Sequence, residues 1–285
     1  MFAERWVASL VASLSLVAAA STLPNEPRPA AAPIVVTVTA TDYAFAAPDT
    51  IAAGFTTFRL VNNSDQFHMA QLIKLEGGKT LDDFRRAYDE AFRTVGPRPA
   101  WAKRLGGPGV AGPHGDSNAT LYLEPGSYVW ICLVNPPPDR LPHVMKGMAR
   151  PFVVRPNSLT PASRIKPEAA VVVQLVDYGF TMSAPLTAGR RMIHVQNTGA
   201  EPHEVGLAKL AAGKTVRDLE AWLKSFDGPP PAELSAGGVS SLAAKTEAYF
   251  EVDLTPGDYV LFCLVTAPDG RSHVAHGMIQ HIHIG

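Results

Sequence analysis

The sequence predicts an all-β protein made of two tandem β-sandwiches, each with one helical insertion. Short β-rich runs bounded by turn residues recur along the chain, Pro (25) and Gly (23) are abundant, and helical apolar periodicity is confined to two places. The chain of 285 residues is long enough for two ordinary domains, and its 46% of hydrophobic residues can supply a core for each.

An internal repeat sets the domain organisation. Asp42-Tyr-Ala-Phe45 corresponds to Asp177-Tyr-Gly-Phe180, and the two copies then run in step without a gap as far as the helical segment. Further matches are Gly54 with Gly189, Asn62 with Asn197, His68 with His203, Gly78-Lys-Thr80 with Gly213-Lys-Thr215, and Pro125-Gly-x-Tyr-Val129 with Pro256-Gly-x-Tyr-Val260. The chain is therefore a tandem duplication.

Six β-strands are expected in each copy, because the runs alternate apolar with polar residues or are rich in β-formers. Those of the first copy are Ile34 to Ala40, Phe55 to Val61, Met69 to Leu75, Ala119 to Leu123, Ser127 to Val134 and Pro151 to Val154. Those of the second are Ala170 to Val176, Arg190 to Gln196, Glu204 to Leu210, Ala248 to Leu254, Asp258 to Val265 and Met278 to Ile284. Helices with Thr at the N-cap are expected at Thr80 to Thr94 and Thr215 to Phe226.

These elements predict one domain over residues 33–155 and another over 169–285, joined by a Pro-containing linker at 156–168. In residues 1–20, Arg5 precedes an uncharged apolar run, which predicts a secretory signal peptide and a periplasmic or secreted protein. A retained anchor is the alternative, although this run is shorter than the roughly 20 residues of a membrane-spanning helix. No membrane span is expected in the mature chain.

The charge balance argues against a nucleic-acid partner. The formal net charge is -1, and there is no Lys/Arg-rich run of the kind that follows a phosphate backbone.

Both copies end in the same chemical pattern. Cys132 is followed by His143 and Gly147-Met148, and Cys263 is followed by His273 and Gly277-Met278. Two cysteines in an exported protein ordinarily suggest a disulfide, but these occupy equivalent places in two separate cores. With His68 and His203, each copy offers two His, one Cys and one Met, which is the ligand set of a mononuclear copper electron-transfer site.

At these residues the chain resembles the cupredoxin, or type 1 (blue) copper, family over nearly its whole mature length, once per copy. The resemblance implies two tandem cupredoxin-like Greek-key β-sandwiches and up to two type 1 copper ions per chain. The ligands it implies are His68, Cys132, His143 and Met148 in the first domain, and His203, Cys263, His273 and Met278 in the second. The His-x3-Gly-Met element is similar to that of nitrite reductases and several multicopper oxidases.

The chain departs from the family at two points. Small cupredoxins often carry Asn directly after the first His, where it ties the ligand loop, whereas Met69 and Glu204 stand here. Multicopper oxidases flank the type 1 Cys with His on both sides. The neighbours here are Ile131 and Leu133 around one Cys, and Phe262 and Leu264 around the other, which does not support a trinuclear cluster.

Three functions are compatible with these patterns. The favoured one is an exported copper protein that transfers single electrons to a redox protein, which the sequence does not identify. A metal-free cupredoxin-like binding or structural module is the main alternative, because a buried Cys or Met often only fills a core. A copper oxidoreductase of the nitrite-reductase kind would need a further site built from the spare histidines, which are His114, His194, His276, His281 and His283. His281 and His283 share one strand face and, with His276, are candidates for such a metal, although a solvated strand explains them more simply. The oligomeric state is open.

Overall fold

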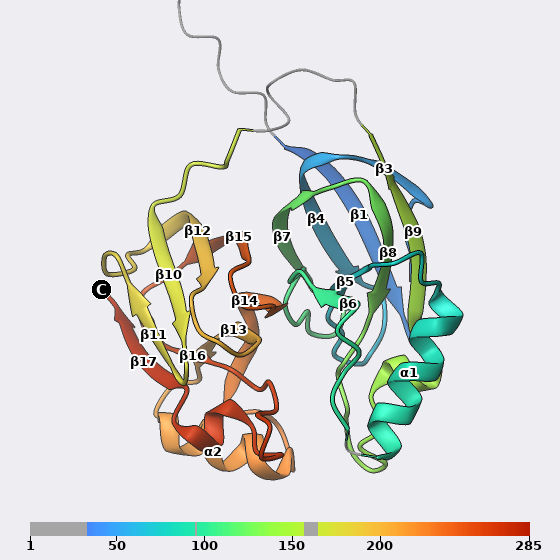
Figure 1. Ribbon diagram of the computed structural model, residues 1–285. Helices are drawn as coiled ribbons and strands as arrows, with labels where there is room; N and C mark the ends of the chain where they lie inside the picture. Colours follow the sequence, from blue (N-terminus) through green and yellow to red (C-terminus); the bar gives the residue numbers. More distant parts are fainter. Residues whose placement is uncertain (1–32, 95, 157–164) are drawn as a thin grey trace, which may run out of the picture. The chain divides into compact units, whose positions relative to one another are not determined.

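The computed structural model describes residues 33–94, 96–156 and 165–285 (Figure 1). The expected signal peptide and most of the expected linker lie outside these ranges. Among the described residues, no helix is long and apolar enough to cross a membrane.

The strands of the first repeat form two layers. One layer has the order β2-β1-β4-β7, with bounds β2 (Ala44–Ala46), β1 (Ile34–Thr41), β4 (Gly54–Asn62) and β7 (Asp116–Leu123). The other has the order β3-β9-β8-β5-β6, with bounds β3 (Thr50–Ala52), β9 (Ala149–Arg155), β8 (Gly126–Ile131), β5 (Gln71–Leu75) and β6 (Ala102–Arg104). Phe58 of β4 meets Trp130 of β8 edge to face, with ring centroids 4.7 Å apart, so the two layers share one aromatic core.

The second repeat repeats this architecture. One layer has the order β11-β10-β12-β15, with bounds β11 (Gly179–Met182), β10 (Val171–Val176), β12 (Gly189–Asn197) and β15 (Glu247–Leu254). The other has the order β14-β13-β16-β17, with bounds β14 (Ala232–Leu242), β13 (His203–Leu210), β16 (Gly257–Phe262) and β17 (Ile279–Ile284). In both repeats the first long strand pairs in parallel with the second long strand, as β1 with β4 and β10 with β12. The predicted all-β fold of two tandem sandwiches is confirmed.

One helix is inserted in each repeat, as predicted. Helix α1 (Leu81–Arg93) and helix α2 (Val216–Ser225) begin after Thr80 and Thr215, respectively. Each Thr side chain accepts a hydrogen bond from the backbone N–H of the Asp three residues on, and the carboxylate of that Asp accepts one from the Thr backbone N–H. These reciprocal bonds satisfy amides that the first helical turn leaves unpaired. The apolar faces pack onto the sandwiches through Phe84 and Tyr88 in α1 and through Leu219 and Leu223 in α2.

All twelve predicted strands are present, with ends that differ by up to three residues, but five others were not predicted. Strands β2, β3, β6 and β11 are three or four residues long, too short for a periodic signal. Strand β14 has eleven residues, but it is rich in Gly, Ser and Ala, which are weak strand formers. A Cβ placed on Gly237 would lie within 3.4 Å of the Phe250 ring. The strand therefore packs closely against this ring at a position where Gly has no side chain.

The two repeats also contact each other. Tyr249 of β15 pairs with Thr120 of β7. This pairing joins the layer that contains β7 and the layer that contains β15 into one eight-stranded sheet. Asn118 donates to the carbonyl of Glu251 and accepts from its N–H, both at 2.8 Å. Since Ala31–Gly285 forms one compact unit by its contacts, the division into domains at 33–155 and 169–285 remains a proposal.

Candidate metal centres

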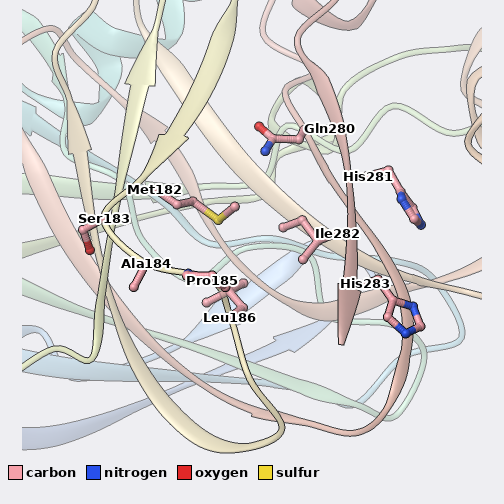
Figure 2. A pocket seen from close by; sticks show the side chains of 9 residues that line it. All are labelled: Met182, Ser183, Ala184, Pro185, Leu186, Gln280, His281, Ile282 and His283. Carbon is pink, nitrogen blue, oxygen red and sulfur yellow. The ribbon is translucent and has the colours of Figure 1, made fainter. Parts of the chain in front are cut away.

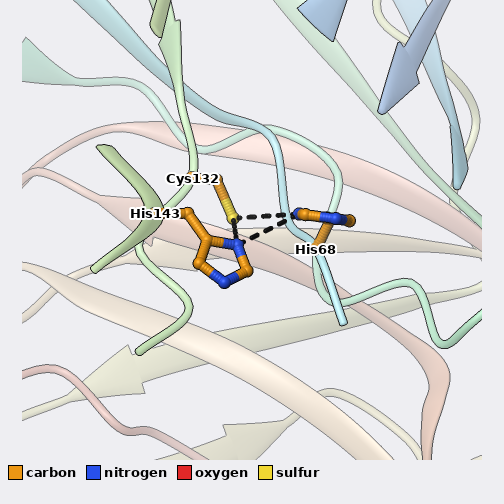
Figure 3. A group of neighbouring side chains, drawn as sticks. All are labelled: His68, Cys132 and His143. Atoms are coloured by element: carbon orange, nitrogen blue, oxygen red, sulfur yellow. Dashed lines mark hydrogen bonds between the residues drawn. The ribbon is translucent and has the colours of Figure 1, made fainter. Parts of the chain in front are cut away.

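The first candidate centre is a buried triangle of one thiol and two imidazoles (Figure 3). Cys132 Sγ lies 3.7 Å from His68 Nδ1 and 3.6 Å from His143 Nδ1. The two Nδ1 atoms are 3.2 Å apart. All three residues are fully buried, with 0% of their surface exposed.

A buried Asn fixes the loop that delivers His68. Asn62, the last residue of β4, donates to the carbonyl oxygens of Gln66 at 2.7 Å and Gly112 at 2.8 Å. It also accepts from the Ser64 N–H at 3.0 Å. Its counterpart Asn197 makes matching bonds in the second repeat. The Asn that ties the ligand loop therefore precedes the first His, whereas small cupredoxins often have it directly afterwards.

A compact loop delivers the other candidate ligands. A short 3-10 helix begins at His143 and ends before Gly147, whose φ of 100° lies in the region that Gly adopts without strain. The Met148 N–H then donates to the His143 carbonyl at 3.0 Å, and the Cys132 N–H donates to the Met148 carbonyl at 3.3 Å. The same turn and the same two bonds recur at His273, Gly277, Met278 and Cys263.

The second candidate centre has the same residue types. His203 Nδ1 lies 2.9 Å from His273 Nδ1, and Cys263 Sγ lies 3.4 Å from His273 Nδ1. These residues are also fully buried. The Glu204 N–H donates to Cys263 Sγ at 3.4 Å, so the thiol sulfur already has one backbone donor.

The spacing of the donor atoms suits one metal ion per centre. Bonds of about 2.0–2.1 Å to imidazole nitrogen and about 2.3 Å to thiolate sulfur, as at zinc sites, place the ligand atoms of one ion roughly 3.3–3.7 Å apart. The first triangle has edges of 3.2, 3.6 and 3.7 Å. The second is slightly tighter, at 2.9 and 3.4 Å for the two edges to His273. Among the described residues, these are the two groups of three or more such side chains that come together.

Met148 and Met278 lie in the same loops and are both fully buried. Their backbones are hydrogen bonded to the Cys and His of each set. Coordination by their thioether sulfur atoms remains a prediction.

Burial disfavours the charged forms of both candidate thiols and of His143. Burial raises the pKa of Cys132 to about 12 and also raises the pKa of Cys263. Burial, and then the proximity of His68, lowers the pKa of His143 to about 4. The thiols are therefore protonated and His143 is neutral near pH 7. Since a metal ion needs the thiolate, its binding would release a proton from each Cys.

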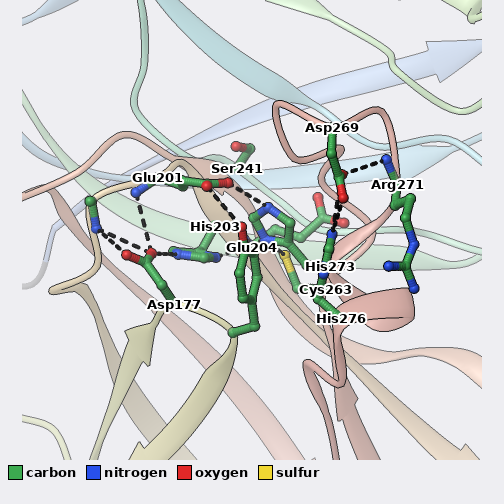
Figure 4. Close-up of polar contacts among 12 residues, drawn as sticks. Asp177, Glu201, His203, Glu204, Ser241, Cys263, Asp269, Arg271, His273 and His276 are labelled. Atoms are coloured by element: carbon green, nitrogen blue, oxygen red, sulfur yellow. Dashed lines mark hydrogen bonds and ion pairs between the residues drawn. The ribbon is translucent and has the colours of Figure 1, made fainter.

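Aromatic side chains cover two of the candidate imidazoles. Neither His143 nor His273 reaches the surface, because both residues are 0% exposed. Tyr43 packs edge-on against His143, with centroids 5.2 Å apart, and Tyr178 packs similarly against His273 at 5.0 Å. Figure 4 shows the polar surroundings of the second centre.

The second nitrogen of each imidazole has a different partner in the two centres. His68 Nε2 lies 2.9 Å from the Ser64 hydroxyl, whereas His203 Nε2 lies 2.6 Å from Asp177 Oδ1 (Figure 4). His273 Nε2 lies 3.1 Å from Glu201 Oε2. His143 Nε2 is buried without a hydrogen-bond partner among the described residues.

Sequence reasoning missed these partner residues. Asp177 was noticed only as part of a repeated Asp-Tyr-x-Phe element, and Glu201 was not singled out. The available signal was the difference between the matched copies, because Glu201 stands where the first repeat has Gln66 and Gly199 where it has Ser64.

The remaining histidines pair with carboxylates. His114 bonds to Asp65, His194 to Glu247 and His276 to Asp269. His281 and His283 do share a face, as predicted, and both lie about 3 Å from the same oxygen of Asp258, at 2.9 and 3.0 Å. They border an open pocket of about 440 Å³ whose other walls include Met182 and Leu186 (Figure 2). His276 lies instead against Tyr178, so these three histidines do not form one cluster.

Comparison with known proteins gives distant structural likenesses. No family model and no curated protein sequence matches the chain. An auracyanin from Roseiflexus castenholzii is 22% identical, with a TM-score of 0.32, and the match covers 44% of this chain and 100% of that one. Auracyanin A, a blue copper protein from Chloroflexus aurantiacus, is also 22% identical, with a TM-score of 0.30 and the same coverage. A multicopper oxidase is 10% identical, with a TM-score of 0.25 and coverage of 88% of both chains.

These scores are low, so the assignment of the fold rests on the strand order and on the repeated His/Cys/His sets. On that evidence the chain is a tandem pair of cupredoxin-like β-sandwiches, each with one buried candidate metal centre.

Proposed function

We propose that the protein is an exported copper protein with two type 1 sites and that it transfers single electrons. The ligands are His68, Cys132, His143 and Met148 in one site, and His203, Cys263, His273 and Met278 in the other. The observation that carries this proposal is the burial, in each repeat, of one thiol and two imidazoles at the spacing of ligands to a single ion.

The donor set favours copper over harder ions. Soft thiolate and imidazole ligands suit copper, zinc and iron, whereas calcium and magnesium prefer oxygen. A thioether as a weak axial ligand is typical of copper sites that transfer electrons, and Met148 and Met278 are available for that position. Bound copper would supply a one-electron couple.

The loops are suited to electron transfer because they are held in place without the ion. Asn62 fixes the loop before His68 through three hydrogen bonds to backbone atoms. The loop from Cys132 to Met148 is closed by bonds within its own backbone. A rigid ligand shell favours rapid electron exchange, because little rearrangement accompanies a change of oxidation state.

The neighbours of the two cysteines favour a carrier over an oxidase. Ile131 and Leu133 flank Cys132, and Phe262 and Leu264 flank Cys263. None of these side chains can ligate a second metal, so neither thiolate has an adjacent imidazole through which electrons reach a further site.

The test is anaerobic titration of copper-loaded protein with a one-electron reductant. We expect the visible absorption to bleach after two electrons per chain, and to return on mixing with an oxidised redox protein. Assays with nitrite and with phenols are expected to show no steady turnover. Turnover that disappears when His281 and His283 are changed to Ala would replace the carrier with an enzyme, and a protein that binds no copper would support the metal-free module.

A further inference from the structure

The two centres differ in the groups that hold their imidazoles. In the second repeat both ligand imidazoles meet carboxylates, with 2.6 Å between His203 Nε2 and Asp177 and 3.1 Å between His273 Nε2 and Glu201 (Figure 4). In the first repeat His68 meets the neutral hydroxyl of Ser64, and His143 has no such partner among the described residues.

One substitution between the repeats explains the pairing of Asp177. Both repeats have this Asp, as Asp42 in the first and Asp177 in the second. A Cβ at Gly199 would lie 2.3 Å from Asp177 Oδ1 and 2.8 Å from His203 Nε2. Gly199 therefore leaves the space in which the carboxylate meets the imidazole. The first repeat has Ser64 there, and its hydroxyl takes the bond to His68 instead.

A second substitution explains the pairing of His273. Glu201 stands where the first repeat has Gln66, whose amide donates to the Tyr43 hydroxyl at 3.4 Å. In the second repeat the Tyr178 hydroxyl donates to Glu201 Oε1 at 2.9 Å. This bond leaves the other carboxylate oxygen for His273.

Both carboxylates are held in place by neighbouring donors. The Ala200 N–H donates to Asp177 Oδ2 at 2.9 Å, and the Glu201 N–H donates to Asp177 Oδ1 at 3.3 Å. The Asp177 carboxylate is therefore fixed beside the ligand imidazole.

A carboxylate that accepts the N–H of a metal-bound imidazole makes that imidazole a stronger electron donor. Its negative charge also favours the more highly charged metal ion, because the attraction grows with the charge of the ion. Two such carboxylates are hydrogen bonded to imidazoles of the second centre, whereas at the first centre Asp42 acts on His68 only through its charge and Ser64 takes the hydrogen bond. Arg104 and Glu204 also lie near that centre, but burial disfavours the charged form of both, lowering the pKa of Arg104 and raising that of Glu204.

We propose that Asp177 and Glu201 are positioning residues that give the second copper site a lower reduction potential and a higher affinity for Cu(II) than the first. This inference rests on the proposed function, since it requires copper at both sites. At equilibrium a single electron that enters the protein then resides mainly on the first site. The duplicated sites are thus an ordered pair.

The experiment uses full-length proteins that each retain one site. Cys263→Ser leaves the first site and Cys132→Ser leaves the second, and the reduction potential of each is measured by spectroelectrochemistry. We expect the second site to be lower by at least a tenfold difference in the electron-exchange constant, which is 59 mV for one electron. Equal potentials, or a lower potential at the first site, would overturn the inference. Loss of visible absorption and copper from both variants would overturn the proposed function instead.

Charge-neutral variants test the assigned cause. In the Cys132→Ser protein, Asp177→Asn and Glu201→Gln should each raise the potential and weaken Cu(II) binding by about 10- to 100-fold. The matched control is Asp258→Asn, which removes a carboxylate that pairs with His281 and His283, not with a candidate ligand. It should leave both quantities unchanged.

If the serine variants do not fold, the redox titration of the otherwise unmodified protein gives the same answer. Asp177→Asn should then move only the lower of two one-electron steps. A shift of the upper step, or an equal shift from Asp258→Asn, would contradict the assignment.

Discussion

The ring of Tyr43 stands edge-on to that of His143, with centroids 5.2 Å apart. Lys146 Nζ lies on the same Tyr ring, 5.2 Å from its centroid. Tyr43 is 38% exposed while His143 is fully buried, so the tyrosine stands between this candidate ligand and the solvent. This cover of His143 by Tyr43 follows from packing and not from any motif.

Removal of the Tyr43 ring should open the first centre to small reagents. In the metal-free protein, the buried thiols with raised pKa are expected to react slowly with a disulfide reagent until the chain unfolds. Tyr43→Ala should speed the reaction of one thiol. Tyr122→Ala, which removes another exposed ring, is the control and should have no effect. Two rapidly reacting thiols in the unmodified folded protein would contradict the buried arrangement.

The two copper sites should be independent, because each repeat supplies its own Cys and both of its imidazoles. Cys132→Ser is expected to remove about half of the visible absorption and to leave the spectrum of the second site intact. The measurement is an optical spectrum at a fixed protein concentration, with Cys263→Ser as the reciprocal variant. Loss of the whole band from either variant would mean that the repeats share one copper.

Gly199→Ala should break the Asp177–His203 pair. The added Cβ would lie 2.3 Å from Asp177 Oδ1 and 2.8 Å from His203 Nε2, so the two side chains must move apart and the imidazole loses its acceptor. We expect Cu(II) affinity at the second site to fall about 10- to 100-fold, as measured by competition with a chelator. Gly179→Ala is the control, since its Cβ would meet Val176 at an ordinary 3.4 Å. Unchanged affinity in Gly199→Ala would show that the pair does not support the site.

His194 should make the metal-free protein less stable in weak acid. It stacks on Tyr249 with centroids 4.2 Å apart, and burial lowers its pKa below 6.5 despite its bond to Glu247. As the pH falls below 6.5, the unfolded chain binds a proton before the folded one, so stability present above 6.5 is lost as the pH falls through the folded pKa. The free energy of unfolding should fall by at most about 1.4 kcal/mol for each pH unit.

The measurement for His194 is the free energy of unfolding by urea between pH 7.5 and 5. Subtracting the values for His194→Gln removes the contributions of all other groups. The difference between the two proteins should change with pH below 6.5, and a difference independent of pH would contradict the assignment.

Much of the fold followed from local patterns. The repeat was visible because Asp-Tyr-x-Phe, Asn, His and Pro-Gly-x-Tyr recur in step. The helices were predictable because Thr80 and Thr215 are good N-cap residues and acidic residues follow them in the first turn. Strand β14 was not predictable in this way, because its Gly237 and Gly238 suit close packing against Phe250 and the Val205 carbonyl and are weak strand formers.

The candidate ligands were also visible in the sequence, but their surroundings were not. Cys132 and His143 belong to one loop, so the sequence itself indicates that they lie close together. The contact of Tyr43 with His143 and that of Asp177 with His203 depend on how distant segments pack. Burial of the imidazoles could not be predicted for the same reason. No residue beside His143 in the sequence indicates that a tyrosine covers it.

The central claim is that each repeat holds one copper ion through its Cys and its two His. Its most direct test is titration of the metal-free protein with Cu(II), followed by metal analysis and an optical spectrum. The account predicts about two copper ions per chain and an intense visible band from thiolate-to-copper charge transfer. The double variant Cys132→Ser/Cys263→Ser should lose the band. A protein that keeps no stoichiometric copper and shows no visible band would contradict the account.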